Sequence, residues 1–114
     1  LPIWYHARGH VESLYYIGKN AFRHRRRDTA VRSFAAADSL VGTLGADPGD
    51  ATMGYAALVL LYLGMTYDEL GQHDEAARCF SRVLELPAHG TSHELARRYR
   101  AAPFSRRPSS ASGS

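Results

Sequence analysis

Small and large apolar residues recur in this 114-residue sequence at a fixed separation of 46 residues. In each copy an alanine follows a glycine by 12 positions, and a phenylalanine follows the alanine by four. Small residues at such positions let two helices approach closely, while the large residues fill the space between them. The separation therefore predicts two copies of one packed helical unit. The matching pairs are Leu14 and Leu60, Ile17 and Leu63, Gly18 and Gly64, Ala30 and Ala76, and Phe34 and Phe80.

Apolar residues also repeat every three or four positions along most of the chain, which is the spacing of an amphipathic helix. No segment alternates with period two for long enough to predict a strand. Short connections between the periodic segments favour antiparallel neighbours, so the expected fold class is all-α. The expected helices cover residues 3–22, 29–44, 51–70, 74–86 and 91–102.

Several residues mark the expected helix ends. Asp28 and Asp50 are suited to N-cap positions, and Gly71 is suited to a C-terminal stop. Thr91 and Glu94 have the T-x-x-E spacing of a capping box, which predicts the start of the last helix.

Two segments lack helical patterning. Residues 45–50 combine glycine, proline and aspartate and predict a loop. Residues 103–114 contain five serines, two prolines and two arginines, and we expect nothing in them to pack. The sequence thus predicts one helical domain over residues 1–102 and a disordered tail over 103–114.

The net charge of +3 conceals an alternation along the chain. Residues 1–34, 35–96 and 97–114 carry net charges of +5, −7 and +5. Such blocks suit a module that stacks head-to-tail or that holds a partner of mixed charge, and the acidic middle would repel phosphate. The single cysteine, Cys79, excludes an intrachain disulfide and is expected to be a packing residue. We expect a fragment or processed chain that is cytoplasmic and does not enter a membrane.

The second unit resembles the tetratricopeptide repeat family. The matching residues are Leu60-x-x-Leu63-Gly64-x-x-Tyr67, then Gly71, Asp74-Glu75-Ala76, Phe80 and Leu84-Glu85-Leu86-Pro87. The first unit matches less well, because Ala21 stands where the family favours tyrosine and Arg25 where it favours glycine. The separation also exceeds the family's 34-residue period. The resemblance covers about residues 11–87 and implies a fragment of a right-handed superhelix, with two long repeats and a C-terminal capping helix.

The resemblance also implies a function. In this family the first helix of each repeat lines a groove that binds a peptide or a helix, so we expect a non-enzymatic scaffold for a protein partner. In the alternative arrangement, the side chains on the groove-lining face are buried against a neighbouring helix, the last helix or a second copy of the chain. The residues that the resemblance places on the groove face are Glu12, Tyr15, Tyr16, Lys19, Phe22, Arg23, Leu58, Leu61, Tyr62, Met65, Asp68 and Glu69. Those predicted to bind the partner are Tyr15, Tyr16, Lys19, Arg23, Leu58, Leu61, Tyr62, Met65 and Glu69.

Two other functions stay open on the sequence. The chain could be the homodimerisation element of a larger bacterial regulator, because two repeats are few to bury their faces alone. The run Arg23–Arg27 could contact nucleic acid, although charged residues in a helical turn are more often simply solvated. Pairs of histidines at helical spacing and adjacent acids such as Asp68-Glu69 are expected at the solvated surface. No catalytic motif is present, and no metal or cofactor is expected.

Overall fold

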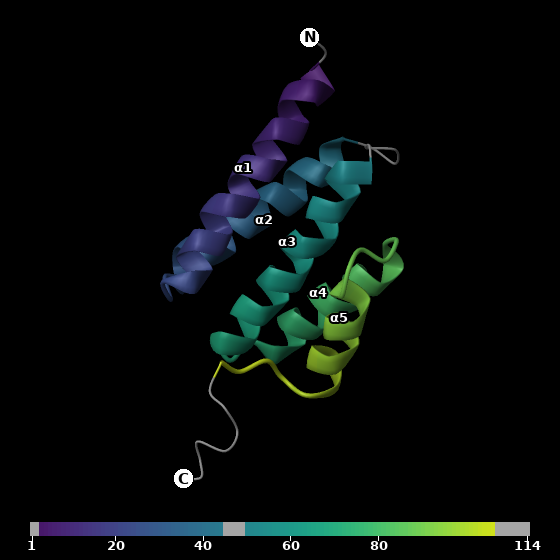
Figure 1. Ribbon diagram of the computed structural model, residues 1–114. Coiled ribbons are helices and arrows are strands. Elements are labelled where there is room, and N and C mark those ends of the chain that lie inside the picture. Colours follow the sequence, from purple (N-terminus) through teal and green to yellow (C-terminus); the bar gives the residue numbers. More distant parts are fainter. Residues whose placement is uncertain (1–2, 45–49, 107–114) are drawn as a thin grey trace.

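The computed structural model describes residues 3–44 and 50–106, except for the side chains of residues 3–5 and 50. These residues form five helices and no strand (Figure 1), which confirms the predicted all-α fold. The helices are α1 (Ile3–Arg23), α2 (Arg27–Thr43), α3 (Asp50–Glu69), α4 (His73–Glu85) and α5 (Ser92–Ala101).

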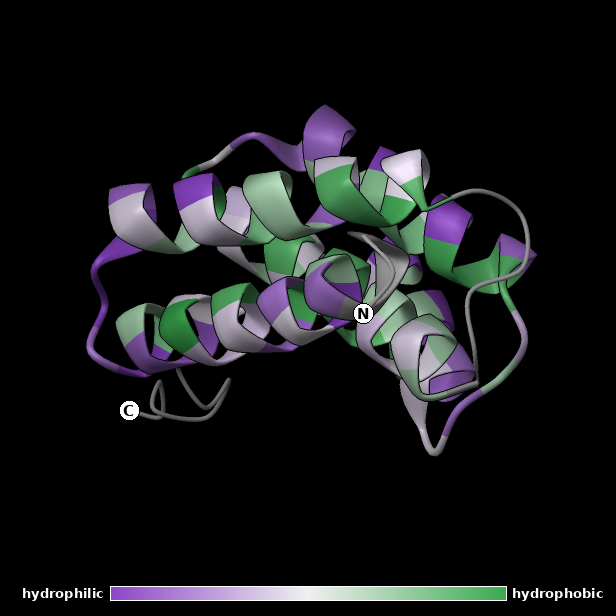
Figure 2. Ribbon diagram, turned by 90° about the horizontal axis from the view of Figure 1, so that it is seen from above, coloured by the Kyte–Doolittle hydropathy of each residue, from purple (hydrophilic) through white to green (hydrophobic). Residues whose placement is uncertain are grey.

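The helices pack as two antiparallel hairpins followed by one more helix. α1 pairs with α2 and α3 pairs with α4, while α3 also packs against both helices of the first hairpin. α5 contacts both helices of the second hairpin, so it takes beside α3 and α4 the place that α3 takes beside α1 and α2 (Figure 1). Apolar and hydrophilic residues alternate along most of the ribbons (Figure 2), as expected for helices that bury one face.

Each hairpin contains the same close contact between its two helices. A Cβ atom built on Gly18 would lie 2.6 Å from Cε1 of Phe34, and one built on Gly64 would lie 2.6 Å from Cε1 of Phe80. Both phenylalanines are fully buried. Each ring therefore lies flat against a glycine, which confirms that the residues separated by 46 positions repeat one packing arrangement.

The turns within the hairpins repeat as well. Arg25 and Gly71, again 46 residues apart, have left-handed backbone conformations with φ angles of 61° and 78°. In both turns the next residue donates its N–H to the carbonyl five positions earlier, at 2.8 Å. Gly71 therefore ends α3 as predicted. In the first turn an arginine adopts the conformation that glycine accepts most easily.

Exchanging the residues at this turn position should change stability in opposite directions. We expect Arg25→Gly to raise the free energy of unfolding by about 1 kcal/mol, because glycine has no Cβ to strain at positive φ. Gly71→Arg should lower it by about the same amount. Urea unfolding followed by circular dichroism measures both changes. A less stable Arg25→Gly variant would show instead that contacts of the arginine side chain outweigh the backbone strain.

Two predicted caps are wrong, although every predicted helix start that the structure describes lies within two residues of the observed one. Asp28 is the second residue of α2, and its N-cap is Arg26, which makes no side-chain hydrogen bond. Because Asp28 lies in the first turn, the negative charge of its carboxylate still interacts favourably with the helix dipole. Thr91 precedes α5 but forms no capping bond; Ser92 Oγ accepts the N–H of His89 instead, at 3.3 Å. The predicted loop at 45–50 falls almost wholly outside the described residues.

The chain continues past α5 and crosses the end of α3 (Figure 1). Phe104 is half-buried against the core, and Arg106 forms an ion pair with Glu69. The expectation that nothing packs after residue 102 is therefore wrong for these two residues, because an aromatic ring and a guanidinium group find partners on other helices. Residues 107–114 lie outside the described part of the chain, and the division into domain and tail stays a prediction.

Opposite charges from the different blocks meet within the fold. Arg27, from the basic first block, places its Nε 3.5 Å from Oε1 of Glu69 in the acidic middle block. Within the middle block, Arg82 of α4 donates two hydrogen bonds to the carboxylate of Asp38 in α2, both at 2.9 Å. Arg106, from the basic third block, pairs with Glu69 of the acidic middle block. The alternating charges along the sequence are thus partly paired with one another within the fold.

Candidate interaction surface

Five aromatic side chains from α1 and α3 form a continuous cluster between the two helices, which we call the aromatic face; Tyr15 and Phe22 are its buried members. Its members are Tyr15, Tyr16, Phe22, Tyr55 and Tyr62. The ring of Tyr16 lies 6.0 Å from that of Tyr55, and the ring of Tyr15 lies 5.4 Å from Tyr55 and 6.0 Å from Tyr62. Phe22 meets Tyr62 edge to face at 5.2 Å. Such arrangements match the quadrupoles of the rings and hold them in defined positions.

Lys19 lies over two of these rings. Its Nζ is 5.8 Å from the centre of Tyr15 and 5.9 Å from that of Tyr62, within the range of a cation–π interaction. The side chain is half-buried, so its stem covers the rings while its charge stays near solvent. Burial, and then the neighbouring Tyr62 and Tyr16, raise the pKa of Tyr15 to about 12, so its phenol stays neutral at physiological pH.

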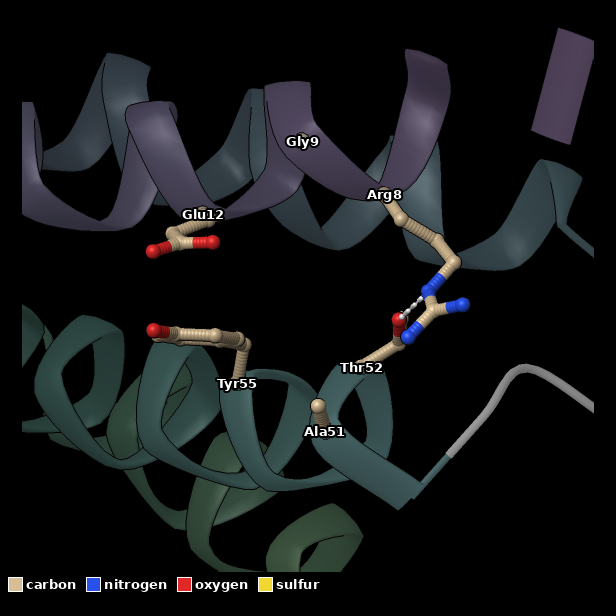
Figure 3. Close-up of a pocket in the computed structure, with 6 residues that line it drawn as sticks. All are labelled: Arg8, Gly9, Glu12, Ala51, Thr52 and Tyr55. Atoms are coloured by element: carbon tan, nitrogen blue, oxygen red, sulfur yellow. Dashed lines mark hydrogen bonds between the residues drawn. The ribbon is translucent and has the colours of Figure 1, made fainter. Parts of the chain in front are cut away.

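Above the aromatic face, an open cavity of about 240 Å³ lies between α1 and α3. Figure 3 shows Arg8 and Glu12 on one side of it and Tyr55 on the other. Arg8 Nε donates a hydrogen bond of 2.9 Å to Thr52 Oγ1. The Tyr55 hydroxyl lies 3.4 Å from that of Tyr16, and this contact, followed by burial and by the charge of Glu12, raises the Tyr55 pKa. The cavity therefore offers a cation, an anion and a neutral hydroxyl.

A second cavity, of about 390 Å³, lies on the other side of α3, next to α5 and the connection that precedes it. Leu58, Leu61 and Leu95 contribute to its wall together with His89. Tyr62 lines this cavity and also belongs to the aromatic face. It therefore lies at the centre of the surface formed by α1, α3 and α5.

The lower end of α3 carries two adjacent carboxylates that are buried. Only 2% of the Asp68 side chain and 7% of the Glu69 side chain are exposed. Asp68 accepts a hydrogen bond of 2.8 Å from the backbone N–H of Phe104, and its other oxygen lies 2.8 Å from Nδ1 of His73. The prediction that these acids lie at a solvated helix end is therefore wrong.

Glu69 is held by arginines from two distant segments. Arg106 contributes Nε at 2.6 Å and Nη2 at 3.0 Å, and Arg27 places its Nε 3.5 Å away. The sequence predicted Glu69 as a partner-binding residue and placed Asp68 on the same groove face, but it missed Phe104 and Arg106. The available signal was the position of two acids at the end of a nearly uncharged helix, in a chain whose last block is basic.

The predicted partner-binding residues divide by exposure. Tyr15 (3%), Leu61 (3%) and Met65 (9%) are buried in the core. Direct contact of these three with a partner does not fit their burial, because α3 is covered by α1 and α2 on one side and by α4 and α5 on the other. Among the remaining predicted residues, Tyr16 and Arg23 are exposed, Lys19, Leu58 and Tyr62 are partly exposed, and the side chain of Glu69 is buried.

Other chemistry that the sequence raised finds little support among the described residues. They contain no group of three histidine, cysteine or acidic side chains arranged to hold a metal. Nε2 of His93 lies 2.7 Å from the carbonyl of Leu86, so this ring is tied to the backbone. Arg27, in the basic run, is half-buried beside Glu69. None of the helices described is long and apolar enough to cross a membrane.

Residues 57–86 match the family model of the tetratricopeptide repeat. The matched segment contains the glycine–phenylalanine contact of the second hairpin and the left-handed turn at Gly71. No match was found among curated proteins or among solved structures. Repeats of this family generally mediate protein–protein interaction and are typically non-enzymatic. Residues 57–86, which lie in α3 and α4, thus match a tetratricopeptide repeat, as the resemblance predicted.

Proposed function

We propose that this chain is a protein-interaction module that binds a peptide or helical segment of a partner on the aromatic face. The observation that carries the proposal is the exposure of Tyr16, whose side chain is 51% accessible while its ring is held by Tyr15 and Tyr55. An exposed aromatic ring that is already fixed loses little conformational entropy on binding. The family's general role in protein–protein interaction supports the same conclusion.

The chemistry of the face indicates what it would bind. Tyr16 and Tyr62 offer partly exposed aromatic surface for apolar side chains of a partner. Lys19 lies over the rings of Tyr15 and Tyr62 and can pair with a carboxylate while it remains packed on them. The cavity that contains Arg8 and Glu12 lies next to Tyr55 and can orient polar groups of the same ligand. We therefore propose a partner segment that combines apolar side chains with an acidic residue.

Selection from a random peptide library displayed on phage, with the full chain as bait, tests the proposal. We expect the selected peptides to share apolar and acidic positions. The combined replacement Tyr16→Ala with Lys19→Ala should weaken binding of a selected peptide about thirtyfold, the usual effect of removing an interface hot spot. Fluorescence anisotropy measures the affinity, and circular dichroism checks that the variant stays helical.

Arg78→Ala is a suitable control, because it also removes one exposed positive charge but lies on α4, away from the face. Its affinity for the selected peptide should equal that of the unmodified chain. A library that yields no shared sequence, or a peptide that binds the Tyr16 and Lys19 variant with undiminished affinity, would refute the proposed function.

A further inference from the structure

The segment after α5 occupies the lower end of the same surface. Arg106 forms two hydrogen bonds with the Glu69 carboxylate, at 2.6 and 3.0 Å, in a fork that only a guanidinium group can make. Its guanidinium carbon also lies 3.8 Å from the centre of the Phe22 ring, and its Nη2 donates to the Phe22 carbonyl. One arginine thus uses the acid of α3 and both the ring and the backbone of α1.

Phe104 is held just as specifically. Its ring lies 6.0 Å from that of Phe22 and 5.1 Å from that of Tyr99 in α5. Its backbone N–H donates to Asp68 Oδ2 at 2.8 Å. The contacts therefore recognise an aromatic side chain, a backbone N–H and, two residues later, an arginine.

The receiving groups are held by residues outside the segment. His73 contacts the second oxygen of Asp68, and the buried Nε atom of Arg27 lies 3.5 Å from Oε1 of Glu69. Both carboxylates are buried and fixed, and fixed acceptors in a partly desolvated site favour charge-assisted recognition. Asp68, Glu69, His73 and Arg27 line a cavity together with Phe104 and Arg106, and the rings of Phe22 and Tyr99 contact Phe104 beside it. We call this site, where the ends of α1, α3 and α5 meet, the acidic pocket.

We propose that the acidic pocket is a binding site for aromatic-X-arginine segments of protein partners, and that residues 104–106 occupy it as an internal competitor. The inference rests on the proposed function, since the pocket adjoins the aromatic face through Phe22. A tethered segment acts at a high effective concentration, so a partner must displace it. The apparent affinity for such a partner is the intrinsic affinity multiplied by the fraction of molecules in which the pocket is empty.

Emptying the pocket in the full chain tests the proposal. The probe is a fluorescein-labelled peptide with the sequence of residues 101–107, AAPFSRR. We expect the variant Phe104→Ala with Arg106→Ala to bind the probe at least tenfold more tightly than the unmodified chain. Adding Glu69→Gln to that variant, or replacing the first arginine of the probe by alanine, should abolish binding. Arg97→Ala, which removes an exposed arginine from α5, is the matched control. This variant should bind the probe as weakly as the unmodified chain does.

A second measurement avoids any variant that fails to fold. In the unmodified chain, the bond to Asp68 should slow hydrogen exchange of the Phe104 amide, and saturating probe should accelerate it. A helical double variant that does not bind the probe, or an amide whose exchange ignores the probe, would overturn the proposal. A dimer whose formation depends on residues 104–106 would also overturn it, by placing the segment in the pocket of a second copy.

The result can be separated from the test of the proposed function. Peptides that bind in a Tyr16-dependent manner, in a chain whose pocket does not accept the probe, leave the function standing and remove this inference. Probe binding by the emptied pocket, without any peptide that depends on Tyr16, confines recognition to the acidic pocket and refutes the aromatic face.

Discussion

Gly64→Ala should lower the free energy of unfolding by about 2 kcal/mol, although alanine is the better helix former. The new methyl group would lie 2.6 Å from Cε1 and 2.9 Å from Cζ of Phe80. Phe80 is fully buried, so its ring cannot move aside without disturbing the core. The clash therefore outweighs the gain in helix propensity. Gly18→Ala should behave alike against Phe34, because the contact is the same.

The matched control is Gly42→Ala, in which the same substitution is made in α2 with nothing within 4 Å of the new Cβ. It should raise the free energy of unfolding by about 0.5–1 kcal/mol through helix propensity alone. Chemical denaturation of the three variants measures the difference. In addition, Phe80→Leu should make the Gly64→Ala change less costly in a double-mutant cycle. Equal effects at Gly42 and Gly64 would contradict close packing of the hairpin.

Cys79 should react with a thiol reagent on the order of a thousandfold more slowly in the folded chain than in the unfolded chain at pH 8. Burial raises the pKa of its thiol from 9.0 to about 12, and only 6% of the residue is exposed. Since the thiolate is the nucleophile, three units of pKa remove about 99.9% of the reactive form. Alkylation with iodoacetamide, followed by mass spectrometry with and without urea, measures the ratio.

The same shift has a consequence for stability. Because the folded-state pKa is the higher one, the unfolded chain alone loses the thiol proton as pH rises above about 9, and stability should fall between there and about pH 12. Cys79→Ala removes the thiol and should remove this part of the pH dependence. Rapid alkylation of the folded chain would contradict the burial of Cys79 and reopen a chemical role for it.

The sequence was sufficient to predict the parts of the fold that depend on local spacing. Five helices, the two hairpins and the glycine–phenylalanine pairs all follow from periodicity and from a repeated motif. The exposure of α3 side chains did not follow. α3 is apolar nearly all round, so periodicity does not tell which of its sides faces solvent, and Leu61 and Met65 proved to be core.

The contacts at the C-terminal end of α3 could not be predicted from the sequence either, for a different reason. The pairing of Arg106 with Glu69 joins residues 37 positions apart, one of them in a segment without periodicity. No propensity or spacing links two such residues, because their meeting depends on where α5 ends relative to α3. Likewise the left-handed conformation of Arg25 is visible only by analogy with the glycine 46 positions later.

The cavity of Figure 3 belongs to the part of the helices that the repeat motif does not contain. The family match begins at residue 57, whereas α3 begins at Asp50, so seven residues, about 10 Å of helix, precede it. Ala51, Thr52 and Tyr55, the α3 residues that line the cavity, all lie in this extension. A ligand of this cavity would therefore contact residues outside the matched repeat, so the match to the family carries no information about what the cavity binds.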